Sequence, residues 1–179
     1  LFQRFNSEIF EDSDYLNQIN VDNGQIFGID GIGFLMNNTF VFNEDNIENF
    51  KKTSQKLPTI NADIVFTQAK TSPKFDSGEL LKFITAVKDF LSDSVGVQKL
   101  EGIEKFRKLK KVFLEYDTLN CINKTNGPNC YLYFVSTGKN AEDPVLNQII
   151  YSQENELKEA FPIYRNIKIK LISRDELIK

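Results

Sequence analysis

The sequence of 179 residues contains no histidine and no tryptophan, and it has only two cysteines and one methionine. Without histidine the chain cannot form a Ser-His-Asp triad, a Cys-His pair or a histidine-based zinc site. The two thiols, Cys121 and Cys130, are too few for a four-ligand zinc centre. Any hydrolytic chemistry therefore has to use carboxylates, lysines and a hard cation.

Long apolar runs are also missing, and no stretch approaches the roughly 18 residues that a membrane span needs. No secretory signal is visible at the start of the sequence. The two cysteines allow either a disulfide that closes a hairpin or a pair of free thiols, and free thiols in a cytoplasmic protein are favoured. Because the first residue is Leu1 and the only methionine is Met36, we expect the chain to be an excised domain of a longer protein.

The net charge of −3 is unevenly distributed along the chain. Residues 1–50 hold nine acids and one base, whereas the remaining residues hold 16 acids and 21 bases. The densest basic stretch lies between Lys99 and Lys111. It is either a solvated helix face or a surface that contacts nucleic-acid phosphates. The candidate phosphate-binding residues are Lys105, Arg107, Lys108, Lys110 and Lys111.

The spacing of apolar residues predicts one domain over 1–179, with no internal repeat or low-complexity linker. Asn37-Asn38 is a turn signal between two short strands, Asp76 and Glu79 have the spacing of a helix capping box, and Asp143-Pro144 is a helix start. The mixed order implies an α/β sheet with helices on both faces. Predicted helices are 1–19, 44–55, 74–92, 102–116 and 144–161, and predicted strands are 27–35, 39–42, 63–69, 130–136 and 167–172.

The segment Gly28-Ile29-Asp30-Gly31-Ile32-Gly33 places an acid between glycines within an apolar, strand-like stretch. An acid is disfavoured in a strand, and a buried acid must be paired or must bind a metal. Asp-Gly is also a common hairpin dipeptide, so the segment has two interpretations, a β-turn or a metal-binding acid.

A second segment, Ile64-Val65-Phe66-Thr67-Gln68-Ala69-Lys70, begins as a central strand and ends with polar residues. Gln68 and Lys70 differ by two positions, so they point to the same face of the strand. An amide beside an ammonium group on a buried face costs desolvation unless an anion lies opposite. Alternatively, Lys70 marks the strand end and reaches solvent.

The two segments in this order, followed by an amphipathic helix, resemble the core of the PD-(D/E)XK nuclease superfamily, and the Gln-x-Lys form is similar to the Mrr-like restriction endonucleases. The runs GIDGIG, DIVFTQAKTS, KFDSGELLKFITAVKDFL and YLYFVSTG resemble more closely the N-terminal region of the AIPR (abortive infection phage resistance) family. This resemblance spans about Glu8 to Lys170. It implies a restriction-endonuclease-like mixed sheet with a core of helix, three strands, helix and strand.

The resemblance also implies roles for individual residues. Asp30 matches the metal-binding Asp, and Gln68 stands where most members carry a second carboxylate, with a carbonyl oxygen that can still ligate Mg²⁺. The Ala69 carbonyl is a further ligand, and Lys70 matches the Lys that positions the attacking water. Glu8, with Glu11 as its alternative, is the candidate for a helix-borne metal ligand, although an acid there can also simply favour the helix dipole.

The function implied by the resemblance is that of a Mg²⁺- or Mn²⁺-dependent endonuclease domain in phage defence. Its expected partners are nucleic acid, preferably DNA, the C-terminal remainder of the parent protein and a possible second copy. Because Gln68 is neutral, a non-catalytic nucleic-acid-binding or sensor module with the same fold stays open. A purely structural or oligomerisation domain is a further alternative, in which Asp30 forms a turn and Lys70 lies at the surface.

Overall fold

The computed structural model describes residues 17–21, 28–54, 60–92, 101–122, 127–138 and 143–177. Within these ranges no helix has both the length and the apolar character that crossing a membrane requires. The helices and strands, in chain order, are β1 (Gly31–Met36), β2 (Thr39–Val41), α2 (Glu44–Ser54), β3 (Ala62–Lys70), α3 (Ser77–Leu91), α4 (Glu101–Phe113), α5 (Tyr116–Cys121), β4 (Asn129–Ser136), α6 (Pro144–Ala160), β5 (Asn166–Ile172) and α7 (Arg174–Leu177).

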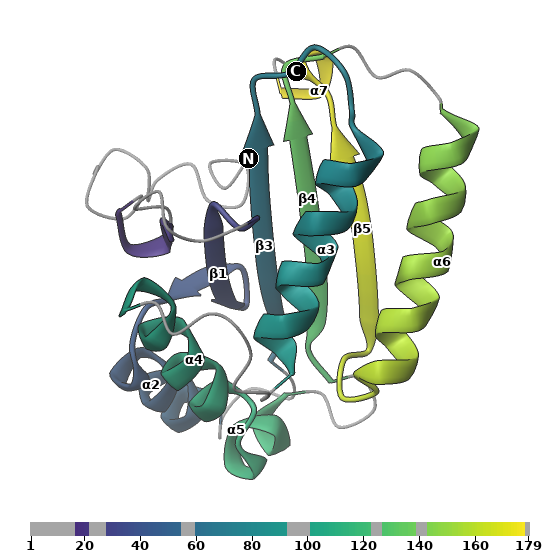
Figure 1. Cartoon of the computed structure of the whole chain (residues 1–179). Helices are drawn as coiled ribbons and strands as arrows, with labels where there is room; N and C mark the ends of the chain where they lie inside the picture. The colour runs from purple at the N-terminus through teal and green to yellow at the C-terminus, as the bar shows by residue number, and fades with distance from the viewer. Residues whose placement is uncertain are drawn as a thin grey trace.

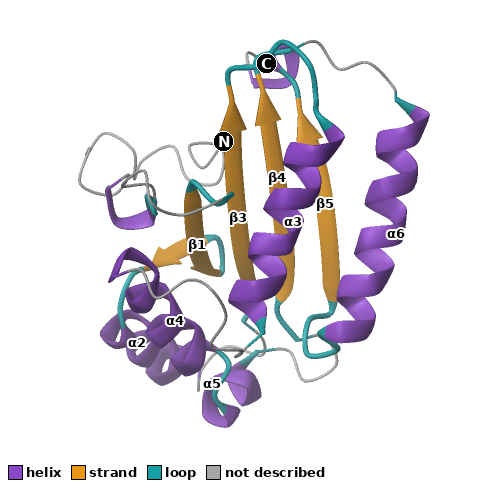
Figure 2. Cartoon of the chain, in the orientation of Figure 1, coloured by secondary structure: helices purple, strands orange, loops and turns teal. Residues whose placement is uncertain are grey.

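The strands form one five-stranded mixed sheet in the order β2-β1-β3-β4-β5 (Figure 1). β1 is antiparallel to both β2 and β3, whereas β3, β4 and β5 run parallel to one another. The α3 helix lies in the connection from β3 to β4, and α6 lies in the connection from β4 to β5 (Figure 2). The carboxyl ends of the three parallel strands therefore meet at one edge of the sheet, beside the first turn of α3.

The main hydrophobic core covers only one face of the sheet. Ile64 and Phe66 of β3 pack there with Phe83 and Phe90 of α3, and the ring centroids of Phe66 and Phe90 are 5.4 Å apart. Each of the helices from α2 to α6 contributes side chains to this core. The prediction of helices on both faces is therefore wrong for these five helices. The opposite face carries a separate cluster of Ile19, Leu35, Phe40, Val65 and Tyr133.

Most predicted elements within the described residues agree with the structure because their local signals are strong. The predicted helix over 1–19 lies almost entirely outside those residues, and the predicted strand over 27–35 begins only at Gly31. Asn37 and Asn38 adopt the positive φ angles that the turn between β1 and β2 needs, at 50° and 64°. The Asp76 side chain accepts a hydrogen bond from the Glu79 N–H at 2.9 Å, and Asp143 caps α6 in the same way. The predicted helix over 102–116 instead ends at Phe113, and α5 follows it as a separate short helix. The α7 helix was also not predicted.

The loops after β3 and β4 are joined at the carboxyl edge of the sheet. The Ser136 hydroxyl donates to the Ser72 carbonyl at 2.7 Å, and the Thr137 N–H donates to the Lys70 carbonyl at 3.2 Å. Gly138 approaches the first loop so closely that a Cβ atom there would lie 2.2 Å from the Pro73 carbonyl oxygen. These contacts hold the end of β3 in a fixed position.

We predict that Gly138→Ala destabilises the protein by about 3 kcal/mol, because the added methyl group overlaps backbone atoms that cannot move independently. Urea unfolding would measure the loss. Gly78→Ala is the matched control, since its nearest neighbour is a movable Asp76 side-chain oxygen at 3.1 Å. Equal stability of the two variants would contradict this account of the loop contact.

Candidate functional site

Asp30 lies directly beside the end of β3. Its N–H donates to the Thr67 carbonyl at 2.8 Å, and its carboxylate Oδ2 accepts from the Ala69 N–H at 2.5 Å. A third bond, from the Val21 N–H to the Asp30 carbonyl at 3.0 Å, fixes the backbone on the other side. The two bonds to β3 go to Thr67 and Ala69, the residues on either side of Gln68. Asp30 therefore lies next to the backbone of Gln68.

Gln68 is buried, with 3% of its surface exposed. It alternates with Ile64 and Phe66, so its side chain lies on the face of the sheet that packs against α3. Its carbonyl oxygen Oε1 is fully enclosed and has no hydrogen-bond partner among the described residues. Because buried polar atoms in proteins are nearly always bonded, an enclosed oxygen of this kind suits an ordered water molecule or a cation as its partner.

Lys70 is the last residue of β3 and shares the face of Gln68. Its ammonium group forms an ion pair with Glu79 of α3, with 3.0 Å between Nζ and Oε2. The other oxygen of Glu79 pairs with Lys82 at 2.7 Å. The hydrogen bonds from Lys82 and Lys70 lower the pKa of the Glu79 carboxyl group. Lys70 is therefore anchored at the protein surface, with 35% of its side chain exposed, and does not extend freely into solvent.

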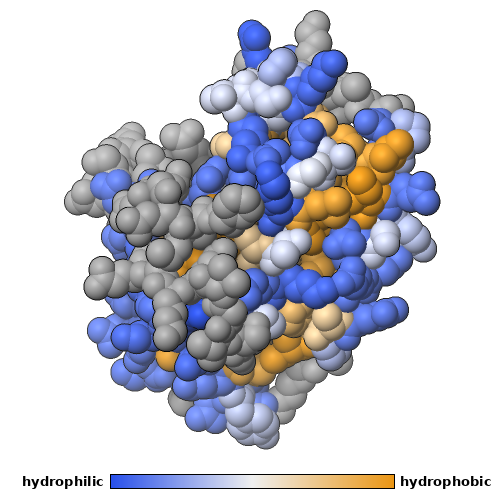
Figure 3. Space-filling view, viewed as in Figure 1, coloured by the Kyte–Doolittle hydropathy of each residue, from blue (hydrophilic) through white to orange (hydrophobic). Residues whose placement is uncertain are grey.

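The edge of the sheet around these residues is polar. Figure 3 shows mainly hydrophilic side chains over the loops at the carboxyl ends of the strands, and apolar side chains at the surface near α3 and α6. The exposed apolar residues there include Leu81 and Val145. Asp30 and Lys70 therefore lie near the polar end of β3, and Gln68 of the same strand is buried.

Three of the predicted candidate metal ligands are not tested by this geometry. Glu8 and Glu11 fall outside the described residues. For Ala69 the structure gives the N–H bond to Asp30, and a role for its carbonyl oxygen stays a prediction. Among the described residues no group of three or more His, Cys, Asp or Glu side chains comes together. From the part of the chain that the structure describes, a metal at this site would have Asp30 and neutral oxygen donors as ligands.

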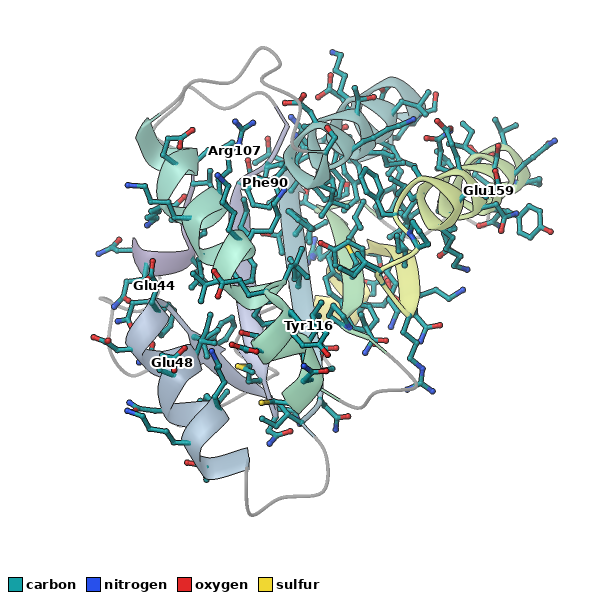
Figure 4. The ribbon with its side chains drawn as sticks, turned by 90° about the horizontal axis from the view of Figure 1, so that it is seen from below. Glu44, Glu48, Phe90, Arg107, Tyr116 and Glu159 are labelled. Carbon is teal, nitrogen blue, oxygen red and sulfur yellow. The ribbon has the colours of Figure 1, made fainter. Side chains whose placement is uncertain are left out.

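The predicted basic surface on α4 is only partly engaged in contacts within the protein. Lys105 donates to the Gln18 carbonyl at 3.1 Å, and burial lowers the pKa of its ammonium group. Arg107 lies between Asp89 and Glu104, each 3.8 Å away, and Figure 4 shows it on the side of α4 toward Phe90. Lys105, Lys108 and Lys111 are all exposed by residue surface area. In Figure 1 α4 lies beside β1, away from the carboxyl end of β3.

Lys110 does not belong to an exposed basic surface, so its assignment to phosphate binding is wrong. Only 3% of Lys110 is exposed. Its ammonium group donates to the carbonyls of Phe90 and Leu91 at 2.8 and 3.1 Å. These carbonyls belong to the last turn of α3, which has no intrahelical donors for them. Lys110 therefore caps α3.

We predict that Lys110→Met lowers the free energy of unfolding by about 1–3 kcal/mol, because two buried carbonyls lose a charged donor. Thermal or urea unfolding would measure the change. Lys108→Met, an exposed site on the same helix, should leave stability unchanged. A stable Lys110→Met chain with weakened nucleic-acid binding would support the original assignment and contradict the capping role.

Cys121 and Cys130 are both free thiols, as favoured from the sequence. Cys130 is buried at the start of β4, and burial raises the pKa of its thiol. Cys121 lies on α5, where its thiol donates to the Asp117 carbonyl at 3.3 Å. A low thiol pKa marks reactive cysteines, so Cys130 has the character of a core residue.

Comparison with known proteins adds no assignment, since no protein-family model, curated protein or solved structure matches the chain. The site is therefore described from its own residues. The sequence pattern singled out Asp30, Gln68 and Lys70 as candidate site residues but not Glu79. The spacing of Asp76 and Glu79 suggested that the Glu79 side chain bonds back to the helix start, whereas the Glu79 carboxylate pairs with Lys70 and Lys82.

Proposed function

We propose that this domain is a Mg²⁺- or Mn²⁺-dependent nuclease that hydrolyses phosphodiester bonds at the carboxyl end of β3. The observation that carries the proposal is the enclosed carbonyl oxygen of Gln68, which has no hydrogen-bond partner among the described residues. Gln68 lies between Thr67 and Ala69, the two residues of β3 that bond to Asp30. The chain order β1, β2, α2, β3, α3, α4, α5, β4 contains the three strands, helix and strand implied by the resemblance, with α2, α4 and α5 as additional helices, and this supports the proposal.

The residues present fit a hard cation. Mg²⁺ and Mn²⁺ prefer carboxylate and amide oxygens, and Mg²⁺ keeps several of its waters when it binds protein. One carboxylate from Asp30 and one carbonyl oxygen from Gln68 therefore suffice as a sparse set of protein ligands. When bound, such an ion supplies charge stabilisation on the phosphate and a water of lowered pKa.

The chain's own residues supply the remaining functions. The Asp30 carboxylate is held in place by the Ala69 N–H, so one of its oxygens is already oriented. Lys70 places a positive charge at the same edge, where it can bind a phosphate oxygen and orient the attacking water. Gln68, enclosed by the core, is held rigidly and does not need to be ordered when substrate binds.

The resemblance to the AIPR family extends this proposal to a role in phage defence, within a longer protein that supplies the trigger. The neutral Gln68 supports an alternative, in which the same edge binds nucleic acid without cutting it. The two functions differ in one measurable respect, since only the nuclease converts substrate to product.

Incubation of the chain with plasmid DNA and with RNA, in Mg²⁺ or Mn²⁺ and in EDTA, tests the proposal. The nuclease function predicts metal-dependent cleavage of at least one of these substrates. Binding of nucleic acid without cleavage would favour the sensor module. The absence of both would reject a nucleic-acid function for the isolated domain.

A further inference from the structure

Lys70 and Glu79 are joined across two elements whose backbones are both firmly held. The backbone of Lys70 is fixed by the pairing of β3 with β4 and by the Thr137 N–H bond to its carbonyl. Glu79 lies in the first turn of α3, where its N–H bonds to the Asp76 cap. The only movable parts of the pair are the two side chains, so the 3.0 Å ion pair decides where the Lys70 ammonium group lies.

The carboxylate of Glu79 is itself oriented by a second lysine. Lys82 binds one oxygen, Oε1, and leaves the other, Oε2, directed at Lys70. Each partner is about one-third to one-half exposed, and ion pairs with such exposure add little to stability. The contact is therefore poorly explained as a stabilising one. It is better explained by the need to hold one specific lysine in one position.

We propose that Glu79 is a positioning residue for Lys70, which it holds at the edge of the metal and phosphate site. This role rests on the proposed nuclease function. An ammonium group has three donors. With one donor bonded to Glu79, the others are available for a phosphate oxygen and for the attacking water. Without Glu79 the four-carbon stem of Lys70 is free to adopt several rotamers, and the aligned arrangement is populated less often.

Kinetics of metal-dependent cleavage by the full chain test this role, with Glu79→Ala, Glu79→Gln and Glu156→Ala compared with the wild type. We expect Glu79→Ala to lower kcat about ten-fold with little change in KM. Glu79→Gln keeps an acceptor oxygen and should recover part of the loss. Glu156 is an exposed acid of α6 that pairs with Lys88 of α3. Glu156→Ala therefore controls for the loss of a surface ion pair and should leave kcat unchanged.

A second readout does not depend on activity. In ¹⁵N spectra of the lysine side chains, an ammonium group held in an ion pair exchanges slowly with water. The Lys70 signal should be visible in the wild type and in Glu156→Ala, and it should be lost in Glu79→Ala. An unchanged Lys70 signal and an unchanged kcat in Glu79→Ala would overturn the positioning role while leaving the nuclease function intact. A wild-type chain that cleaves no substrate would instead overturn the proposed function and this role with it.

Discussion

Asp30→Asn is expected to lower metal-dependent cleavage by about 10³-fold or more while the chain stays folded. The amide oxygen of asparagine can still accept the Ala69 N–H bond that the carboxylate accepts at 2.5 Å. The substitution therefore removes a negative charge and retains the local hydrogen bond. Loss of the Asp30 carboxylate removes the charged ligand that the proposed site offers to a divalent cation. Initial rates at saturating Mg²⁺, together with the melting temperature, measure both effects.

A matched control for this charge removal is Asp143→Asn. Asp143 also accepts a backbone N–H, from Val145 at 2.8 Å, but it caps α6 at another position. Its amide variant should cleave at the wild-type rate. Lys70→Ala should resemble Asp30→Asn in its loss of activity, because the group that orients water is removed. Cleavage at the wild-type rate by Asp30→Asn would mean that Asp30 serves the turn alone.

The second large effect is expected at Gln68. The substitutions Gln68→Leu and Gln68→Glu distinguish a role as metal ligand from a role in packing alone. Leu is similar in volume and has no oxygen, so Gln68→Leu should lose cleavage and the rise in melting temperature that Mg²⁺ gives the wild type. Its stability without metal should be unchanged or higher, because a buried oxygen without a donor is removed.

Gln68→Glu should behave in the opposite way. Without metal the new carboxylate lies in a site that is only 3% exposed, so the melting temperature should fall. With Mg²⁺ it should recover, and cleavage should equal or exceed that of the wild type, because a charged ligand replaces a neutral one. If Gln68→Leu cleaves normally, Gln68 is not a ligand, and the site reduces to Asp30 and Lys70.

The parts of the site that could be predicted from the sequence are those set by strand geometry. Gln68 and Lys70 are two positions apart on a strand, so their side chains had to lie on the same face of the sheet. The polar end of this apolar strand suggested where the candidate site lies. The proximity of Asp30 to Gln68 follows from the antiparallel pairing of β1 with β3, which places Gly31 opposite Thr67. The pattern of apolar residues and the caps at Asp76 and Asp143 likewise predicted the main helices.

The parts that were missed depend on how distant elements dock. In the sequence, Lys110 is one of several basic residues in a charged segment. Its ammonium group is buried and caps α3 only because α4 packs against the end of that helix. The pair of Lys70 with Glu79 depends on the first turn of α3 lying over the end of β3. Similarly, Glu154 of α6 accepts the Ile169 N–H of the edge strand β5 at 2.9 Å, which no local pattern indicates.

Anomalous diffraction from a crystal soaked in Mn²⁺ tests the central claim most directly, because it locates the ion without relying on activity. The account predicts one anomalous peak within ligand distance, about 2.1–2.2 Å, of both an Asp30 carboxylate oxygen and the Gln68 carbonyl oxygen. The peak should be absent from Asp30→Asn crystals treated identically. A wild-type crystal with no ion at the end of β3, and with a water molecule donating to Gln68 Oε1, would contradict it.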